Sequence, residues 1–372
     1  MHDLPVHDLI VIGGGIHGAA VAQAASENGL SVLVLEQYSQ PGMATSSKSS
    51  KLIHGGLRYL ESGQFRLVRE CLEERRYLLE TYPDLVRLVP FHIPVYTHTS
   101  RRPWLIRLGL SLYSLFSHKG FRSIRRAQWP QLDGLKTAGL QNVFQYYDAQ
   151  TDDKKLTQRI METAISQGAK CITGAHFESA TCSDDGCEVH YRYEDQNHIA
   201  SCKLLINCAG PWVNEVLDRI QPHPTQRDME LVLGTHIVVP GQLERGMYYL
   251  EAPQDKRAVF VMPWKDNTLI GTTESRATEP YNPAPPDADI EYLLTVYNHY
   301  FNRQLIRSNV LDAFAGLRVL PASSGHAFSR PRDTIIHHDN TPHPKVFSLY
   351  GGKLTAHRAT ARQLLRVITP YL

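Results

Sequence analysis

The chain has 372 residues, of which 42% are hydrophobic and 20% charged, and its formal net charge is +2. This length favours two closely connected domains, and the nearly balanced charge implies no nucleic acid or other polyelectrolyte partner. No apolar run reaches the roughly 20 residues that cross a bilayer. The first strand begins by Asp8, which leaves no room for a signal peptide. We therefore expect a cytoplasmic protein.

Residues 8–36 predict a βαβ unit that binds an adenine dinucleotide. An apolar run leads into a glycine loop, an Ala-rich segment follows, and a second apolar run closes on Glu36. Gly13, Gly15 and Gly18 stand at the G-x-G-x-x-G positions, which serve the tight turn, the approach to a pyrophosphate and the helix–strand packing. With Gly14, they would hold the pyrophosphate at the helix N-terminus. Glu36 would accept hydrogen bonds from a ribose diol.

Two segments follow this unit. A Ser/Thr-rich stretch at 45–51 lies about one strand length beyond Glu36 and precedes the run LIHGGLRYL at 52–60. Apolar residues at helical spacing then predict a helix over 65–80, which Tyr82-Pro83 stops.

The block from 88 to 130 is basic. No acidic residue stands between Asp84 and Asp133, whereas arginines and lysines are frequent there. The run WLIRLGLSLYSLF at 104–116 is too short to span a bilayer and has basic residues at both ends, so segment 101–126 suits the plane of an anionic membrane surface. The alternative is a buried core helix with solvated arginines around it. Both interpretations stay open.

The remaining elements alternate between strands and helices. We expect a helix over 156–167, a buried strand over 203–208 that exits through Ala209-Gly210, and short antiparallel strands between 229 and 270. Asp289 opens an amphipathic helix after a Pro-rich connector. A strand at 346–350 then runs through Gly351-Gly352 into a C-terminal helix.

Five of the six cysteines fall between 171 and 208, with histidines among them. No C-x-x-C or H-x-x-x-H spacing occurs there, so we expect no metal site. We expect reduced, structural cysteines instead.

Three strand–glycine turns, at 12–18, 207–212 and 349–355, are spread along the chain. Such a separation suits a long cofactor that threads through a whole domain, whereas NAD usually binds within one contiguous half of a sheet. The pattern therefore predicts FAD.

The run ATSSKSSKLIHGGLRYLESGQFRLVRECLEER resembles the FAD-dependent, membrane-associated glycerol-3-phosphate dehydrogenases, within the D-amino-acid-oxidase-like flavoproteins. The resemblance continues through RPWLIRLGLSLY, INCAGPW, GTHIVVP, VFVMPW, LIGTTE, FAGLRVLP and YGGKLT. It implies oxidation of sn-glycerol 3-phosphate to dihydroxyacetone phosphate, with hydride passing to flavin N5 and electrons to quinone or another acceptor. It also implies peripheral association with the inner face of the cell membrane, and we consider a homodimer.

We expect an α/β fold with a Rossmann-like FAD-binding domain and an antiparallel-sheet substrate or cap domain. The first would comprise 1–85, 145–230 and 330–372, and the second 86–144 and 231–329. Members of the family commonly continue into a further helical domain, and we expect this protein to lack it. Glu274 stands where the family usually has Asp, a change that affects specificity.

The chemistry needs a proton acceptor for the substrate hydroxyl and fixed cations for its phosphate. The resemblance points to His236, Arg318 and Tyr59 for catalysis and to Arg58, Arg330, Arg332 and Lys353 for substrate binding. It leaves Arg330 or Arg332 open as the phosphate ligand. The candidates for cofactor binding are Gly13, Gly14, Gly15, Gly18, Glu36, Thr45, Ser46, Ser47, Leu52, His54, Gly210, Trp212, Gly352, Lys353, Leu354 and Thr355.

Two other functions stay open. One is an FAD-dependent oxidase or dehydrogenase of another small hydroxy acid or amine, which would need one cation for a carboxylate rather than several for a phosphate. The other is a flavin-binding module without turnover.

Overall fold

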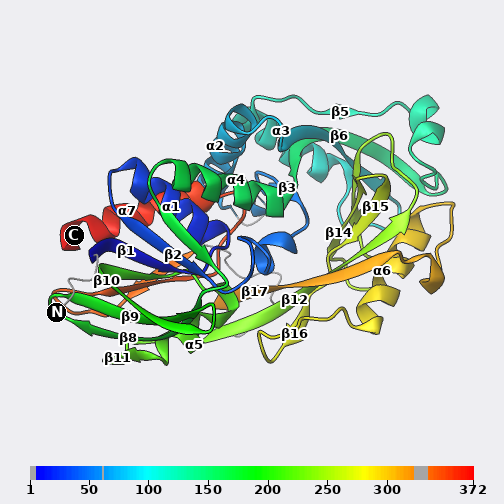
Figure 1. The fold of residues 1–372 in the computed structure, drawn as a ribbon. Helices are drawn as coiled ribbons and strands as arrows, with labels where there is room; N and C mark the ends of the chain where they lie inside the picture. The colour runs from blue at the N-terminus through cyan, green and yellow to red at the C-terminus, as the bar shows by residue number, and fades with distance from the viewer. Residues whose placement is uncertain (1–5, 61–62, 322–333) are drawn as a thin grey trace.

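The computed structural model describes residues 6–60, 63–321 and 334–372. In this part of the chain two sheets lie side by side, each with its own helices (Figure 1). The fold is therefore α/β, as the sequence predicts.

The first sheet has a parallel centre. Its order is β11-β8-β9-β10-β1-β2-β7, with β19 beside β10 and β18 beside β19, and strands β1, β2, β7, β10 and β19 run parallel. The bounds are β1 (Val6–Ile12), β2 (Val32–Glu36), β7 (Lys170–Thr173), β8 (His176–Ser183), β9 (Gly186–Tyr193), β10 (Gln196–Asn207), β11 (Ile220–Gln221), β18 (Ile335–His338) and β19 (Val346–Tyr350).

The central strands of this sheet are apolar throughout, so both faces of the sheet are packed against other elements. On one face Leu9 and Val34 pack against α1 (Ile16–Glu27), α4 (Asp153–Ser166) and α7 (His357–Ile368). The small alanines of α1 allow this close packing. On the other face Ile10 and Leu35 pack against β8, β9 and α5 (Val213–Leu217).

The second sheet is mostly antiparallel, with the order β16-β12-β15-β14-β13-β4-β6-β3; β17 pairs with β12, and β5 with β6. Helices α2 (Phe65–Thr81), α3 (Pro103–Ser117) and α6 (Asp287–Tyr300) pack on it. The bounds are β3 (Leu52–Ile53), β4 (Val86–Tyr96), β5 (Arg122–Ser123), β6 (Leu140–Thr151), β12 (Met229–Pro240), β13 (Met247–Glu251), β14 (Ala258–Trp264), β15 (Asn267–Gly271), β16 (Ser275–Ala277) and β17 (Asp312–Pro321).

The paired strands β12 and β17 connect the two halves of the molecule (Figure 1). Leu233 of β12 and Leu317 of β17 belong to the core beside the first sheet, whereas Ile237 of β12 belongs to the core of the second. Side chains in the middle of this ribbon therefore lie at the junction of the two halves. The proposed domain boundaries stay a prediction, and residues 145–151 of β6 pair in the second sheet.

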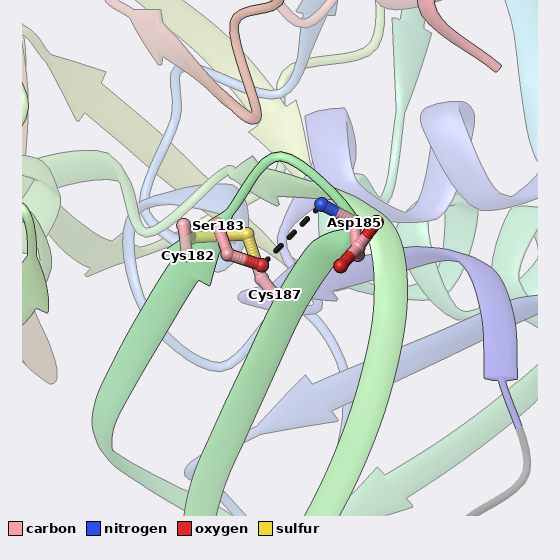
Figure 2. Close-up of a disulfide and its surroundings, with 4 residues drawn as sticks. All are labelled: Cys182, Ser183, Asp185 and Cys187. Carbon is pink, nitrogen blue, oxygen red and sulfur yellow. Dashed lines mark hydrogen bonds between the residues drawn. A yellow bond between two sulfur atoms is a disulfide. The ribbon is translucent and has the colours of Figure 1, made fainter.

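The strand, the glycine turn and the C-terminal helix follow one another as predicted, although α7 begins only at His357, a few residues after Gly351-Gly352. One expectation is corrected. Cys182 and Cys187, expected to be reduced, form a disulfide (Figure 2). They lie opposite each other in the β8–β9 register, and Asp185 N donates to Ser183 Oγ in the turn between them.

None of the helices in the described part of the chain is both long enough and apolar enough to cross a membrane.

Candidate active site

A cavity of about 640 Å³ lies at the junction of the two halves. Its wall includes residues from all three glycine turns, from the 42–56 segment and from β12 and β17. The three turns, which are far apart in the sequence, therefore meet at one site, as a long cofactor requires.

The glycine loop has the geometry of a pyrophosphate cradle. Gly13 has φ +99°, and a Cβ on Gly18 would come within 1.8 Å of the Gly13 carbonyl oxygen, so neither position accepts a side chain. Gly15 borders the cavity. The Ile16 N–H at the start of α1 donates to Ser46 Oγ at 2.9 Å. Backbone thus lies directly against the cavity at the helix N-terminus, where an anion is favoured.

The carboxylate of Glu36 holds this loop by accepting hydrogen bonds from the backbone. Its Oε2 accepts from Gly14 N at 2.6 Å and its Oε1 from Tyr38 N at 2.8 Å. Burial raises the pKa of this carboxyl, and the two backbone donors oppose that rise. Each oxygen keeps a further lone pair, so the residue can hold the loop and still accept from a ribose hydroxyl.

Most of the cofactor candidates line the cavity. They are Gly13, Gly15, Glu36, Thr45, Ser46, Leu52, His54, Gly210, Trp212, Gly352, Lys353, Leu354 and Thr355. Three do not: Gly14 lies against Glu36, Gly18 lies under Gly13, and Ser47 donates to the Met43 carbonyl. The Nε1 atom of Trp212 is buried and has no hydrogen-bond partner among the described residues. This unpaired donor in the cavity wall fits a site that holds a polar ligand.

The third turn lies against the start of α1 and against the 42–56 segment. A Cβ on Gly352 would lie 1.9 Å from His17 Nε2, and His54 N donates to Thr355 Oγ1 at 3.3 Å. Burial, followed by the charge of His357, lowers the pKa of His17 to about 4. His17 is therefore a neutral packing residue beneath Gly352.

His236, on β12, is 1% exposed and lines the cavity. Its ring stacks on Phe314 with the centroids 5.1 Å apart, and Nε2 lies 2.9 Å from Ser50 Oγ. Nδ1 makes no hydrogen bond of good geometry within the described residues. It lies near the Gly234 backbone, which favours the protonated ring and so slightly opposes the lowering of the His236 pKa by burial. Burial, followed by the charges of Arg318 and Lys51, lowers the pKa of His236 to about 3. The imidazole is therefore neutral and able to accept a proton.

Arg318, on β17, lines the same cavity. Its Nη1 donates to Glu274 Oε1 at 2.8 Å and its Nη2 to Thr272 Oγ1 at 3.2 Å. A Cβ on Gly234 would come within 2.7 Å of Nη2, so this glycine makes room for the guanidinium. His236 and Arg318 thus come together from neighbouring strands.

Four candidates cannot be compared at the level of side chains. Arg58 and Tyr59 belong to the 3₁₀ turn η2 (Leu57–Leu60), and their side chains lie outside the described part of the structure. Arg330 and Arg332 lie outside the described residues.

Sequence reasoning missed Ser50 and the pair Lys51–Asp153, which lie beside His236. Ser50 and Lys51 belong to the TSSKSSK run, but nothing in that run indicates which hydroxyl contacts the histidine. Glu274 was identified only as a departure from the family, and its contact with Arg318 comes from the structure. Among the described residues, no group of three or more His, Cys, Asp or Glu side chains could hold a metal.

The comparisons agree with this geometry. The sequence profile of the DAO family, described as FAD dependent oxidoreductase, matches residues 8–362. The aerobic glycerol-3-phosphate dehydrogenase of Escherichia coli is 37% identical over 98% of this chain and 74% of its own length. The D-erythritol 1-phosphate dehydrogenase of Brucella abortus is 36% identical over 96% of this chain and 72% of its own.

Solved structures give the same fold. The glycerol-3-phosphate dehydrogenase of Bacillus halodurans, complexed with FAD, superposes with a TM-score of 0.79 at 25% identity, over 98% of this chain and 64% of that one. The L-alpha-glycerophosphate oxidase of Mycoplasma pneumoniae, with FAD bound, has a TM-score of 0.76 at 17% identity and shows the fold alone. The predicted flavin cofactor is confirmed, and the chain belongs to the DAO family of FAD-dependent oxidoreductases.

Proposed function

We propose that this protein oxidises sn-glycerol 3-phosphate to dihydroxyacetone phosphate and passes the electrons to a membrane quinone. The observation that carries the proposal is the pairing of a neutral, buried His236 with a fixed Arg318 in one cavity. Relatives named for glycerol 3-phosphate and erythritol 1-phosphate support a phosphorylated polyol as the substrate. FAD supplies the hydride acceptor when bound.

The cations of the cavity favour a phosphate over a carboxylate. Arg318 and Arg257 both donate to Glu274, and Lys353 lines the same described wall; several cations about one cavity suit a dianion. Arg318 would hold the phosphate from the cavity wall. Arg58, Tyr59, Arg330 and Arg332 stay substrate candidates on the strength of the resemblance alone.

His236 would take the proton of the substrate hydroxyl at Nε2, beside Ser50. Its low pKa in the free protein makes it a weak base, because burial, followed by the charges of Arg318 and Lys51, opposes a positive charge there. A phosphate dianion against Arg318 would offset that charge and raise the pKa of His236. Substrate binding would thus strengthen the base that the reaction needs.

The surface of α3 favours an anionic membrane. Only Leu110 and Tyr113 of this helix are buried, whereas Trp104 is 65%, Leu108 52% and Leu115 70% exposed. These exposed apolar side chains favour the membrane interpretation over the buried core helix. Exposed basic residues lie on the helix or flank it in the sequence, namely Arg102, Arg107, Lys119, Arg122, Arg125 and Arg126. An apolar face with a basic rim suits the headgroup region of an anionic bilayer. We propose peripheral association of this face with the inner side of the cell membrane.

The cavity extends toward the same helix. Asp148 and Tyr146 line it, and Tyr113 of α3 donates to Asp148 at 2.8 Å and packs edge-on against Tyr146. A docked α3 would therefore bring the part of the cavity wall around Asp148 close to the lipid, where a quinone is dissolved. This arrangement supports quinone as the electron acceptor.

The experiment is anaerobic addition of substrate to the purified holoenzyme, followed by the visible absorbance of the flavin. We expect glycerol 3-phosphate to bleach it, erythritol phosphate to bleach it more slowly, and unphosphorylated glycerol to leave it oxidised. Bleaching by a hydroxy acid or an amine, with none by glycerol 3-phosphate, would establish the alternative oxidoreductase. No bleaching by any of them would indicate a module without turnover. A quinone in anionic vesicles should then restore the absorbance faster than dioxygen does.

A further inference from the structure

A buried lysine lies beside the proposed base. The Lys51 side chain is 6% exposed, and Nζ donates to Asp153 Oδ1 and to the Ser47 carbonyl, both at 2.6 Å. Asp153, the first residue of α4, is fully buried. Burying such a pair costs desolvation energy that an apolar pair would not. The pair therefore calls for an explanation other than stability.

The backbone supports the same conclusion. Lys51 has φ +60°, in the left-handed region that favours glycine. A residue with a long side chain is kept there although the conformation is unfavourable for it. The side chain of Lys51 is thus what the position requires.

The pair controls the turn that carries Ser50. Asp153 Oδ2 accepts from both Ser49 N and Ser49 Oγ, at 2.9 and 2.7 Å, and Ser49 Oγ accepts from Lys51 N at 3.1 Å. The neighbours of Ser50 on both sides are therefore anchored to one carboxylate. Ser50 Oγ in turn lies 2.9 Å from His236 Nε2.

The charge of Lys51 also reaches the base. Its Nζ lies 5.2 Å from the centroid of the Phe314 ring, on which His236 stacks. We propose that Lys51, held by Asp153, is a positioning residue for the reaction: it holds Ser50 against His236 and places a fixed positive charge beside the imidazole before substrate binds. This inference rests on the proposed role of His236 as the base.

Other charged groups share this environment. Arg318 of β17 acts on His236 in the same direction as Lys51, and Glu274 partly neutralises Arg318. Lys48 lies 5.4 Å from the Phe314 centroid, and His54 and Lys353 line the same cavity. Lys51 differs from them because its charge and its hydrogen bonds both act on the Ser50–His236 contact.

The test compares K51M, K51R and S50A with K265M in the holoenzyme. Lys265 is the matched control, because it is an exposed lysine near the Trp264 ring that Lys51 also approaches. Two measurements are made across pH: the rate of anaerobic flavin reduction by glycerol 3-phosphate, and the titration of histidine imidazoles by NMR. The His236 signal is assigned with H236N.

For K51M we expect the titration of His236, and the acid limb of the rate profile with it, to move up by about one pH unit or more. The reduction rate at neutral pH should fall about tenfold, because Ser50 is no longer held against His236, while substrate affinity changes little. K51R, which keeps the charge, should restore the titration, and K265M should match the wild type. An unchanged titration and profile in K51M would overturn the inference.

S50A decides the matter if K51M does not retain FAD, because it removes one hydroxyl and leaves the ion pair intact. We expect its reduction rate to fall about tenfold with normal thermal stability; a wild-type rate would overturn the inference. The NMR titration needs no substrate. Failure of the wild type to be reduced by glycerol 3-phosphate would therefore count against the proposed function, and the titration would still test Lys51.

Discussion

Arg318 and Glu274 form an ion pair in the wall of the cavity, with Nη1 and Oε1 2.8 Å apart. The carboxylate side chain is 6% exposed and that of the arginine 24%. The guanidinium is therefore held in one orientation before any ligand arrives. Such preorganisation lowers the entropy that a bound phosphate would otherwise lose in ordering the arginine.

Replacement of Arg318 by lysine should weaken substrate binding. The planar guanidinium can contact Glu274, Thr272 and a phosphate at the same time, and an ammonium group lacks this geometry. We expect the KM for glycerol 3-phosphate to rise about 10- to 100-fold with normal FAD content. R276K is the control, since Arg276 is an exposed arginine that pairs with Glu230. Steady-state kinetics check this, and equal KM values for R318K and R276K would remove Arg318 from the substrate site.

Local patterns predict the first half of this site well. The glycine spacing of residues 13–18 places a turn, a helix N-terminus and Glu36 within one βαβ unit, because all these parts are neighbours in the sequence. The Ser50–His236 contact joins residues 186 positions apart, and the Arg318–Glu274 contact joins β17 to the link between β15 and β16, 44 positions earlier. Pattern alone contains neither the register of β12 and β17 nor the rotamers that complete these contacts.

The missed disulfide is a different case, because a local signal was present. Asp185-Gly186 is a hairpin turn signal within a β-rich segment. The turn residues of this hairpin are Asp184 and Asp185, one position before that signal, and they set Cys182 opposite Cys187, as the β8–β9 register has it. The start of α7 could not be found this way, since residues 353–356 carry no helix-breaking residue that would delay the helix to His357.

The role of Glu36 in the loop leads to a prediction about cofactor affinity. In E36Q, the amide NH₂ would face one of the two backbone N–H groups that the carboxylate now accepts from. A buried donor left unsatisfied costs about 1–3 kcal/mol, so the dissociation constant for FAD should rise about tenfold or more. Flavin fluorescence titration of the apoprotein measures this, with E27Q at the exposed end of α1 as the control. Equal affinities in both variants would separate Glu36 from cofactor binding.

The substitutions L108E and L115E should each release the protein from anionic vesicles. In both, a negative charge replaces apolar surface at the membrane and is repelled by the lipid headgroups. We expect the partition coefficient in co-sedimentation to fall about tenfold or more for each variant. L311E carries the same change at another exposed leucine, outside α3, and should bind vesicles normally. Binding of L108E and L115E equal to that of L311E would exclude α3 as the docking face.

Buried histidines should make the fold sensitive to acid. Burial lowers the pKa of both His92 and His17 to about 4. In the unfolded chain the histidines become protonated near pH 6.5, whereas the buried ones stay neutral until the pH nears 4. The unfolding free energy is therefore unaffected by these residues above pH 6.5 and decreases as the pH falls from there toward 4. Each such histidine should cost about 2 kcal/mol of unfolding free energy between pH 7 and 5.

His92 offers the cleaner test, because it lies outside the cavity wall, next to Gln145 and the Met247 carbonyl. In H92Q the loss of unfolding free energy between pH 7 and 5 should shrink by about 2 kcal/mol, since the glutamine does not titrate. H223Q, at an exposed histidine, should keep the full loss. Urea unfolding at constant excess FAD measures these differences. If H92Q lost as much stability as H223Q over this pH range, His92 would have to be protonated in the folded protein, and burial would not be what holds its pKa down.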